Sequence, residues 1–268
     1  TLSAVKPRLL SAEEPYASEQ LAEALRDHGV DVRVDTSATA AARDADGTIT
    51  LTLSTGERVA GDELLVGVGR RPHTDDLGLD TVGLKPGATV AVNDAMRAFD
   101  PTHPGPAPSD WLYAIGDVNG RALLTHAGKY QALIAAATIC NRAASADWDG
   151  PMSPRVVFTE PQIGAVGLTL ERALQDGVQA HAVDADPGAT AGASFVGRGA
   201  ASGARIVVDE QREVIVGATF AGPEIAESLH AATIAIVGEV PLRRLVHAIP
   251  PFPTRSEVWL KLLAPWAP

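Results

Sequence analysis

The stretch Trp111-Leu112-Tyr113-Ala114-Ile115-Gly116-Asp117 decides the fold class of this chain. Its apolar first part is typical of a buried strand, Gly116-Asp117 turns the chain, and the alanine-rich segment 123–142 has a helical pattern. Such a strand places Asp117 at the carboxyl edge of a sheet, where open α/β sheets bind ligands. Taken alone, however, a Gly-Asp pair is more often a turn that caps the next helix.

Upstream of this stretch, the pattern alternates between helix and strand. A helix is predicted over 13–29, because Leu21, Ala24 and Leu25 share one helical face and Gly29 follows them. Strands are predicted at 30–34, 48–53 and 58–68, with the middle pair forming a hairpin. The apolar run 64–68 predicts a buried strand that leaves its sheet through Gly67-x-Gly69.

Downstream, the pattern of predicted strands and helices changes. The proline-dense segment 99–111 predicts a surface loop, and residues 150–154 predict a domain boundary. Beyond it, strands are expected at 155–159, 178–183, 203–209 and 214–220, and helices at 169–176, 225–238 and 256–263. This mixture indicates an α+β domain.

Composition excludes several classes of protein. The formal charge of -11 argues against nucleic acid as a partner, because such binders cluster Lys and Arg. No apolar run approaches the roughly 20 residues that cross a bilayer, so no membrane span is expected. The single cysteine, Cys140, lies in an apolar run and is predicted to be buried, and a chain without disulfides fits the cytoplasm.

The motif Tyr113-Ala-Ile-Gly116-Asp117 resembles the second flavin motif of the pyridine nucleotide-disulfide oxidoreductase family. The resemblance implies that Asp117, after Gly116, holds the ribityl chain of FAD. Leu124-Thr125-His126 stands where the family opens a helix, whose backbone N–H groups would face the flavin pyrimidine oxygen. No metal site is expected.

A second similarity lies upstream, at Gly67-Val-Gly69-Arg70-Arg-Pro-His73. This segment resembles the family's Gly-Arg-x-Pro-Asn turn, where the chain leaves the nicotinamide-nucleotide domain for the flavin domain. It implies that Gly67, Gly69 and Arg70 approach a cofactor, although His73 replaces the usual Asn.

The carboxyl-terminal segments 154–161 and 164–169 are similar to the opening of the family's dimerisation domain, and 251–257 resembles its His-Pro-Thr-x-Ser-Glu signature. Phe252 replaces the acid-base histidine, and Glu257 matches the glutamate that pairs with it. The resemblance implies a homodimer through 151–268 and a cis bond at Phe252-Pro253. A core aromatic is the alternative interpretation of Phe252.

The implied architecture is an α/β pair of incomplete Rossmann-like domains followed by an α+β dimerisation domain. The expected domains are 1–82, the second half of an NAD(P)-binding domain; 83–150, the returning segment of an FAD-binding domain; and 151–268. No Gly-x-Gly-x-x-Gly follows a strand and no cysteine pair is present, so we expect an amino-terminally truncated chain. The resemblance places Ala4 at the position that selects the nucleotide, and nearby Lys6 and Arg8 favour NADP over NAD.

The expected function of the parent protein is transfer of hydride from NAD(P)H through FAD to a small electron acceptor. Because a phenyl ring cannot shuttle protons, Phe252 favours a quinone-like acceptor over a disulfide. Two alternatives remain open: a dithiol-disulfide reductase of the dihydrolipoamide dehydrogenase kind, and, for this chain as it stands, a non-catalytic dimerisation fragment.

Overall fold

The computed structural model describes residues 1–102, 110–195 and 202–267, so most of the predicted proline-dense loop lies outside the described residues. The chain divides into two compact units, one formed by residues 1–66 together with 154–268 and the other by residues 67–153. Each unit has its own buried apolar cluster.

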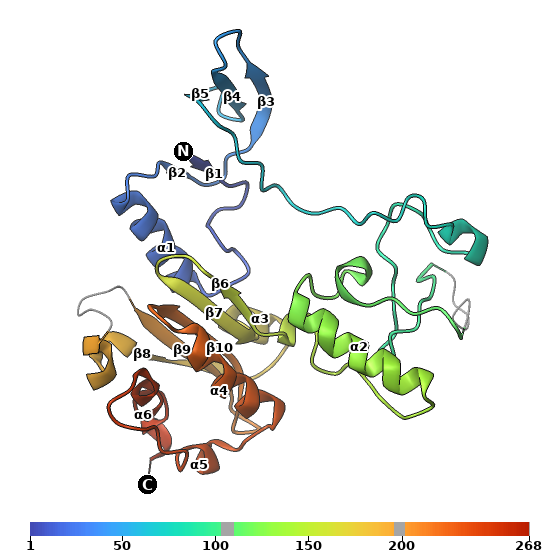
Figure 1. Cartoon of the computed structure of the whole chain (residues 1–268). Coiled ribbons are helices and arrows are strands. Elements are labelled where there is room, and N and C mark those ends of the chain that lie inside the picture. Colours follow the sequence, from blue (N-terminus) through green and yellow to red (C-terminus); the bar gives the residue numbers. More distant parts are fainter. Residues whose placement is uncertain (103–109, 196–201, 268) are drawn as a thin grey trace. The chain divides into compact units, whose positions relative to one another are not determined.

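A five-stranded antiparallel sheet forms the centre of the first unit (Figure 1). Its strands, in spatial order, are β6 (Arg155–Val157), β7 (Gln162–Gly167), β10 (Val214–Gly222), β9 (Gly203–Asp209) and β8 (Ala180–Ala185). Four of them confirm the predicted strands. β7 was not predicted, because its glycine- and alanine-rich sequence has a low strand propensity.

Helices α1 (Pro15–Asp27) and α4 (Ala226–Val237) cover opposite faces of this sheet. Leu21 of α1 packs in a cluster with Ile163 of β7. The next residue, Gly164, faces α4, and a Cβ added there would lie 3.0 Å from Ile225 Cδ1. Because successive residues of a strand point to opposite faces, the two helices lie on different sides. Gly164 therefore permits the close approach of α4.

Ion pairs between partly exposed arginines and buried carboxylates hold the start of α1 against the sheet. Arg155 donates two hydrogen bonds to Glu13, at 2.6 and 2.8 Å. Arg205 of β9 donates to Glu14 at 2.8 Å. The hydroxyl of Tyr16 donates to a carbonyl of β10 at 2.7 Å, and burial raises the pKa of this phenol. The segment that precedes and opens α1 is thus part of the same folded unit as the sheet.

The remaining elements of the first unit are short. Strands β1 (Leu2–Ser3) and β2 (Val32–Arg33) are parallel, and β3 (Ala38–Arg43), β4 (Ile49–Leu53) and β5 (Arg58–Gly61) form an antiparallel sheet. The β4–β5 pair confirms the predicted hairpin, whereas the alanine-rich β3 was not predicted. The other helices are α3 (Leu170–Gln175), α5 (Leu242–Leu245) and α6 (Val258–Leu262).

The second unit has little regular structure apart from α2 (Thr125–Ile139). Its core gathers Leu79, Leu84, Val90, Met96 and Ala114, with other apolar side chains around them. The predicted strand at 111–115 forms only one bridge, between residues 113 and 97. Among the described residues, 96–98 supply only two backbone hydrogen bonds to this segment, from the Ala98 N–H to the Leu112 carbonyl at 2.9 Å and from the Ala114 N–H to the Met96 carbonyl at 3.2 Å, which is too short a ladder for a regular strand.

Two further predictions were wrong. Residues 64–68 form no strand, and Leu65 is 96% exposed, because no described strand pairs with this segment. Cys140 is exposed rather than buried, since α2 ends at Ile139 and Cys140 caps it beyond the packed turns.

Short 3₁₀ helices complete the chain: η1 (Leu79–Val82), η2 (Gly116–Asn119), η3 (Gly150–Met152), η4 (Pro187–Ala189), η5 (Ala191–Phe195), η6 (Arg255–Glu257) and η7 (Ala264–Trp266). Within the described ranges, no helix has the length and apolar character needed to cross a membrane.

Candidate functional site

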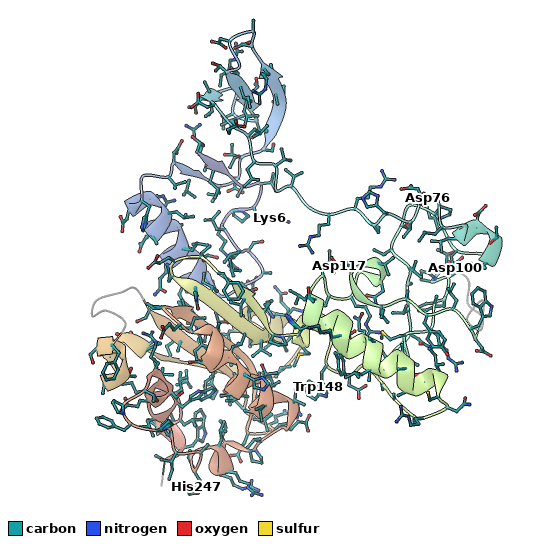
Figure 2. The ribbon with its side chains drawn as sticks, in the orientation of Figure 1. Lys6, Asp76, Asp100, Asp117, Trp148 and His247 are labelled. Atoms are coloured by element: carbon teal, nitrogen blue, oxygen red, sulfur yellow. The ribbon has the colours of Figure 1, made fainter. Side chains whose placement is uncertain are left out.

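The turn that carries Asp117 lies against the first turns of α2, within the second unit. Gly116 begins η2 with a φ of 76°, a left-handed conformation that favours glycine. A Cβ added to Gly128 of α2 would lie 3.2 Å from the Gly116 Cα. The absence of a side chain at Gly128 therefore lets the turn approach the helix, whereas a Cβ on Gly116 would meet no atom within 4 Å. Figure 2 shows Asp117 near the start of α2.

Arg70 brings the predicted Gly-Arg segment to the same place. Its Nη1 donates to Asp117 Oδ2 at 3.0 Å and to the carbonyl of Leu123 at 3.3 Å. Both charged side chains are largely exposed, so solvent screens the ion pair. Gly67 and Gly69 precede Arg70 in an exposed segment, and a Cβ at either glycine would meet no atom within 4 Å. The structure thus brings together, within the second unit, the predicted Gly-Arg turn and the Gly-Asp turn.

The start of α2 supplies backbone donors. Leu124 is the N-cap, and no side chain caps the helix at this end. Thr125 and His126 form its first turn, where N–H groups lack carbonyl partners within the helix and the helix dipole favours negative charge. A carboxylate and a helix start lie together, which suits a ligand with hydroxyl groups and an electron-rich oxygen.

A buried polar network lies beneath the turn, and the sequence interpretation missed it. Gln131 of α2 is fully buried, and its Oε1 accepts from the Gly116 N–H at 2.7 Å and from Asn119 Nδ2 at 2.9 Å. Its Nε2 donates to Asp149 Oδ2 at 2.9 Å. The only sign of this network in the sequence was the amide side chain of Gln131 within an alanine-rich helix.

Arg121 closes this network. It donates to Asp149 Oδ1 through Nε at 3.1 Å and Nη2 at 2.7 Å, and to Asp94 at 2.9 Å. Burial acts to lower the pKa of Arg121, but the bonds to Asp94 and Asp149 outweigh it and raise the pKa above its ordinary value. The guanidinium therefore stays charged opposite the buried carboxylate.

The residues predicted to select the nucleotide lie in the first unit. Lys6 is exposed (Figure 2). Arg8 donates to the carbonyl of Glu13 at 2.6 Å and to Ser18 Oγ at 3.1 Å, so its guanidinium anchors the loop to the start of α1. A 2′-phosphate would have to compete with these partners for Arg8.

The carboxyl-terminal loop also belongs to the first unit. The Phe252-Pro253 bond is cis, as expected, and Phe252 is 78% exposed, so the alternative of a core aromatic was wrong. Glu257 Oε2 accepts from the backbone N–H groups of Thr254 at 3.3 Å and Gly192 at 3.4 Å. Its carboxylate therefore holds the loop that presents Phe252.

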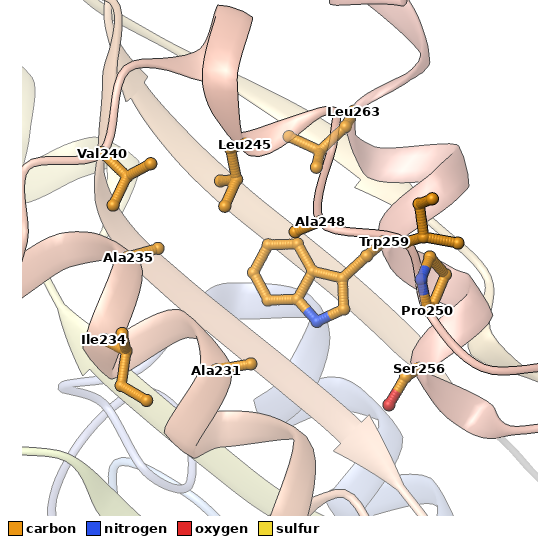
Figure 3. Close-up of a pocket in the computed structure, with 11 residues that line it drawn as sticks. Ala231, Ile234, Ala235, Val240, Leu245, Ala248, Pro250, Ser256, Trp259 and Leu263 are labelled. Atoms are coloured by element: carbon orange, nitrogen blue, oxygen red, sulfur yellow. The ribbon is translucent and has the colours of Figure 1, made fainter.

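An apolar pocket of about 380 Å³ lies between α4, α5 and α6 (Figure 3). Ile234, Leu245 and Trp259 are among its lining residues, and Ser256 is the polar one. Trp259 Nε1 is buried without a hydrogen-bond partner in the described part of the chain. Because no lining side chain is titratable, this pocket offers no group for acid-base chemistry. No described group of three or more His, Cys, Asp or Glu residues could hold a metal ion.

Residues 1–137 match the model of the pyridine nucleotide-disulphide oxidoreductase family, and residues 153–263 match the model of that family's dimerisation domain.

Similar curated proteins include the dihydrolipoyl dehydrogenase of Thermus scotoductus, 32% identical over 263 residues, which are 96% of this chain and 54% of that protein. The Chlamydia pneumoniae dihydrolipoyl dehydrogenase is 34% identical over 74% of this chain and 41% of that protein. The chain therefore spans about half the length of the curated relatives that it matches.

Solved structures show the same fold at lower identity. LpdA from Mycobacterium tuberculosis matches with a TM-score of 0.86 at 20% identity, covering 99% of this chain and 56% of that one. The HOCl-induced flavoprotein disulfide reductase RclA from Escherichia coli matches with a TM-score of 0.82 at 20% identity, covering 98% and 58%.

Proposed function

The chain belongs to the pyridine nucleotide-disulphide oxidoreductase family, and from that premise we propose that the protein containing it transfers hydride between NAD(P)H and a small acceptor through FAD. The observation that carries the proposal is the meeting of Asp117, Arg70 and the uncapped start of α2 in one place.

The residues present fit one end of FAD. The exposed carboxylate of Asp117 can accept hydrogen bonds from ribityl hydroxyls, and the space beside Gly116 is open. Backbone N–H groups at residues 124–126 can donate to the pyrimidine oxygen and stabilise negative charge there. When bound, FAD supplies the two-electron chemistry that no side chain offers. Arg70 can exchange its bond with Asp117 for an acidic group of a cofactor.

The chain contains only part of a complete cofactor site. No Gly-x-Gly-x-x-Gly follows a strand in its sequence, so it lacks the loop that binds a dinucleotide pyrophosphate. We therefore expect weak flavin binding by the chain alone, which leaves the alternative of a non-catalytic dimerisation fragment open for it. The domains 1–82, 83–150 and 151–268 and a homodimer through the last of them are part of the same proposal, which the dimerisation-domain match supports.

A dithiol-disulfide couple is the acceptor class that the comparisons favour, because the curated relatives quoted above are dihydrolipoyl dehydrogenases. The chain has one cysteine, so a redox-active pair would have to come from elsewhere in the protein.

A quinone-like acceptor is the second candidate, and Phe252 supports it. The exposed phenyl ring lies in the loop that Glu257 holds, at the position that resembles that of the family's acid-base histidine. A phenyl group cannot protonate a leaving thiolate, whereas a quinone can take its protons from solvent.

The two candidates predict different kinetics for the flavoprotein that contains this chain. A dithiol enzyme should reduce lipoamide with NAD(P)H faster than it reduces a benzoquinone. A quinone reductase should show the reverse, and Phe252→His should raise the lipoamide rate while leaving the quinone rate within about twofold. Equal lipoamide rates with and without Phe252→His would show that Phe252 does not determine the choice of acceptor.

The choice between NADPH and NADH rests on Lys6, because Arg8 is engaged with its own loop. Lys6→Ala should lower kcat/KM for NADPH by about five- to tenfold and leave NADH unchanged, as expected for loss of one phosphate contact. An equal loss with both nucleotides would exclude a contact with the 2′-phosphate.

A further inference from the structure

We propose that Gln131 is a positioning residue for the flavin site, which fixes the Gly116–Asp117 turn by tying it to the buried Asp149–Arg121 ion pair. The inference rests on the proposed role of Asp117 in holding FAD. It concerns a side chain that makes no contact with the exposed carboxylate itself.

One oxygen atom holds both ends of the turn. Gln131 Oε1 accepts from the Gly116 N–H at 2.7 Å and from Asn119 Nδ2 at 2.9 Å, and Asn119 also donates to the carbonyl of Ala114 at 3.1 Å. Asp117 lies between these two anchored residues. Its side chain bonds to Arg70 in an exposed, screened pair, so the backbone of the turn decides where the carboxylate lies.

The network also fixes which way the Gln131 amide points. Its Nε2 donates to Asp149 Oδ2 at 2.9 Å, and Asp149 accepts two bonds from Arg121. A flipped amide would set its NH₂ against two donors, Gly116 and Asn119, and its oxygen against a carboxylate. The buried ion pair therefore selects the orientation in which Gln131 accepts from the turn.

Burial makes this arrangement sensitive to substitution. Gln131 is 0% exposed and Asp149 is 5% exposed, so water cannot replace a lost partner without a rearrangement. Gln131→Met keeps the length of the side chain and removes all three of its hydrogen bonds. The freed Gly116 N–H and Asn119 amide then seek water, and the turn moves away from α2.

A charge exchange gives a rescue test. Gln131→Glu alone places two carboxylates together, and Asp149→Asn alone removes the buried negative charge that faces Arg121, which keeps only Asp94 as an ionic partner. In the double variant Gln131→Glu/Asp149→Asn, the introduced carboxylate accepts from Gly116 and Asn119, and the introduced amide donates to it while accepting from Arg121. The double variant thus restores the hydrogen-bond pattern, with the negative charge at position 131 instead of position 149.

The experiment uses the 268-residue chain and two readouts. Amide hydrogen exchange of Gly116 by NMR reports the turn, and titration with FAD reports the site. We expect Gln131→Met to speed Gly116 exchange and weaken FAD binding by about tenfold, a change of about 1.4 kcal/mol. Exchange at Val92 in the core should not change, the double variant should recover at least half of both losses, and Gln175→Met on the exposed face of α3 should match the wild type.

The outcomes separate this inference from the proposed function. If Asp117→Asn weakens FAD binding but Gln131→Met changes neither readout, the positioning role fails alone. The role also fails if the double variant is no better than either single one. If Asp117→Asn and the wild type bind FAD equally, the proposed function fails at this site and the inference fails with it.

Discussion

Loss of Arg205 should destabilise the first unit more than loss of any exposed ion pair. Arg205 donates to the buried carboxylate of Glu14 at 2.8 Å and to the exposed carboxylate of Asp184 at 2.7 and 2.8 Å. The bonds to Asp184 and Glu14 raise its pKa, so the guanidinium is charged at any pH where the fold is studied. Arg205→Met removes both sets of bonds at once.

The two partners contribute unequally. Breaking a buried ion pair by removing one partner costs about 3–5 kcal/mol. We expect a loss of about 3 kcal/mol in the free energy of unfolding, at the low end, because Glu14 still accepts from the Leu170 N–H at 2.7 Å. Asp184→Asn should cost less than about 1 kcal/mol, since its carboxylate is exposed.

Urea unfolding at pH 7 measures these losses, and hydrogen exchange at the amides of β9 and β10 assigns them to the first unit. In a double-mutant cycle, Glu14→Gln combined with Arg205→Met should recover about 1.5–3 kcal/mol relative to the sum of the single losses. Equal losses for Arg205→Met and Asp184→Asn would refute the argument, because the buried partner would then contribute nothing.

Three further results are expected. Asp117→Ala should weaken FAD binding by about 1.5–3 kcal/mol in a fluorescence titration, and Asp76→Ala should not; equal losses would contradict a ribityl contact. Ile234→Glu, on the exposed edge of the apolar pocket, should shift a homodimer toward monomer in sedimentation at micromolar concentration, whereas Leu133→Glu on α2 should leave it dimeric. Burial of its hydroxyl raises the pKa of Tyr16 in the folded chain. Above about pH 10 the unfolded chain therefore releases a proton that the folded chain retains, and stability falls as pH rises. Tyr16→Phe should lower the free energy of unfolding by about 0.5–1.5 kcal/mol at pH 7 and flatten the alkaline loss of stability, as measured by urea unfolding at several pH values.

Most strands and helices of the dimerisation region were predicted from the sequence, because the residues of each element indicate its secondary structure without reference to its neighbours. Apolar runs rich in Val and Ile mark β9 and β10, and Thr169 caps α3 through a bond from the Arg172 N–H at 3.2 Å. Such signals are local, so they survive without knowledge of neighbours. β7 escaped prediction because its strand character depends on the strands beside it.

Prediction failed where an element depends on a distant partner. Residues 64–68 and 111–115 have apolar runs typical of buried strands, yet strand formation needs a neighbouring ladder. The candidate flavin site was also predicted only in part. Motifs identified Asp117 and the start of α2, but the support from Gln131 depends on Asp149, whose proximity no local pattern indicates.

The attachment of α1 to the sheet has a consequence for synthesis of the protein. Tyr16 bonds to the carbonyl of Thr219, 203 residues further along the chain. At about 5–20 residues per second, a ribosome makes α1 roughly 10–40 seconds before it makes β10. Until β7 and β10 are made, the apolar face of α1 with Ala17 and Leu21 lacks its partners Ile163 and Ala221 in the five-stranded sheet. The packing of α1 against the five-stranded sheet is therefore completed only after the carboxyl-terminal strands have been made.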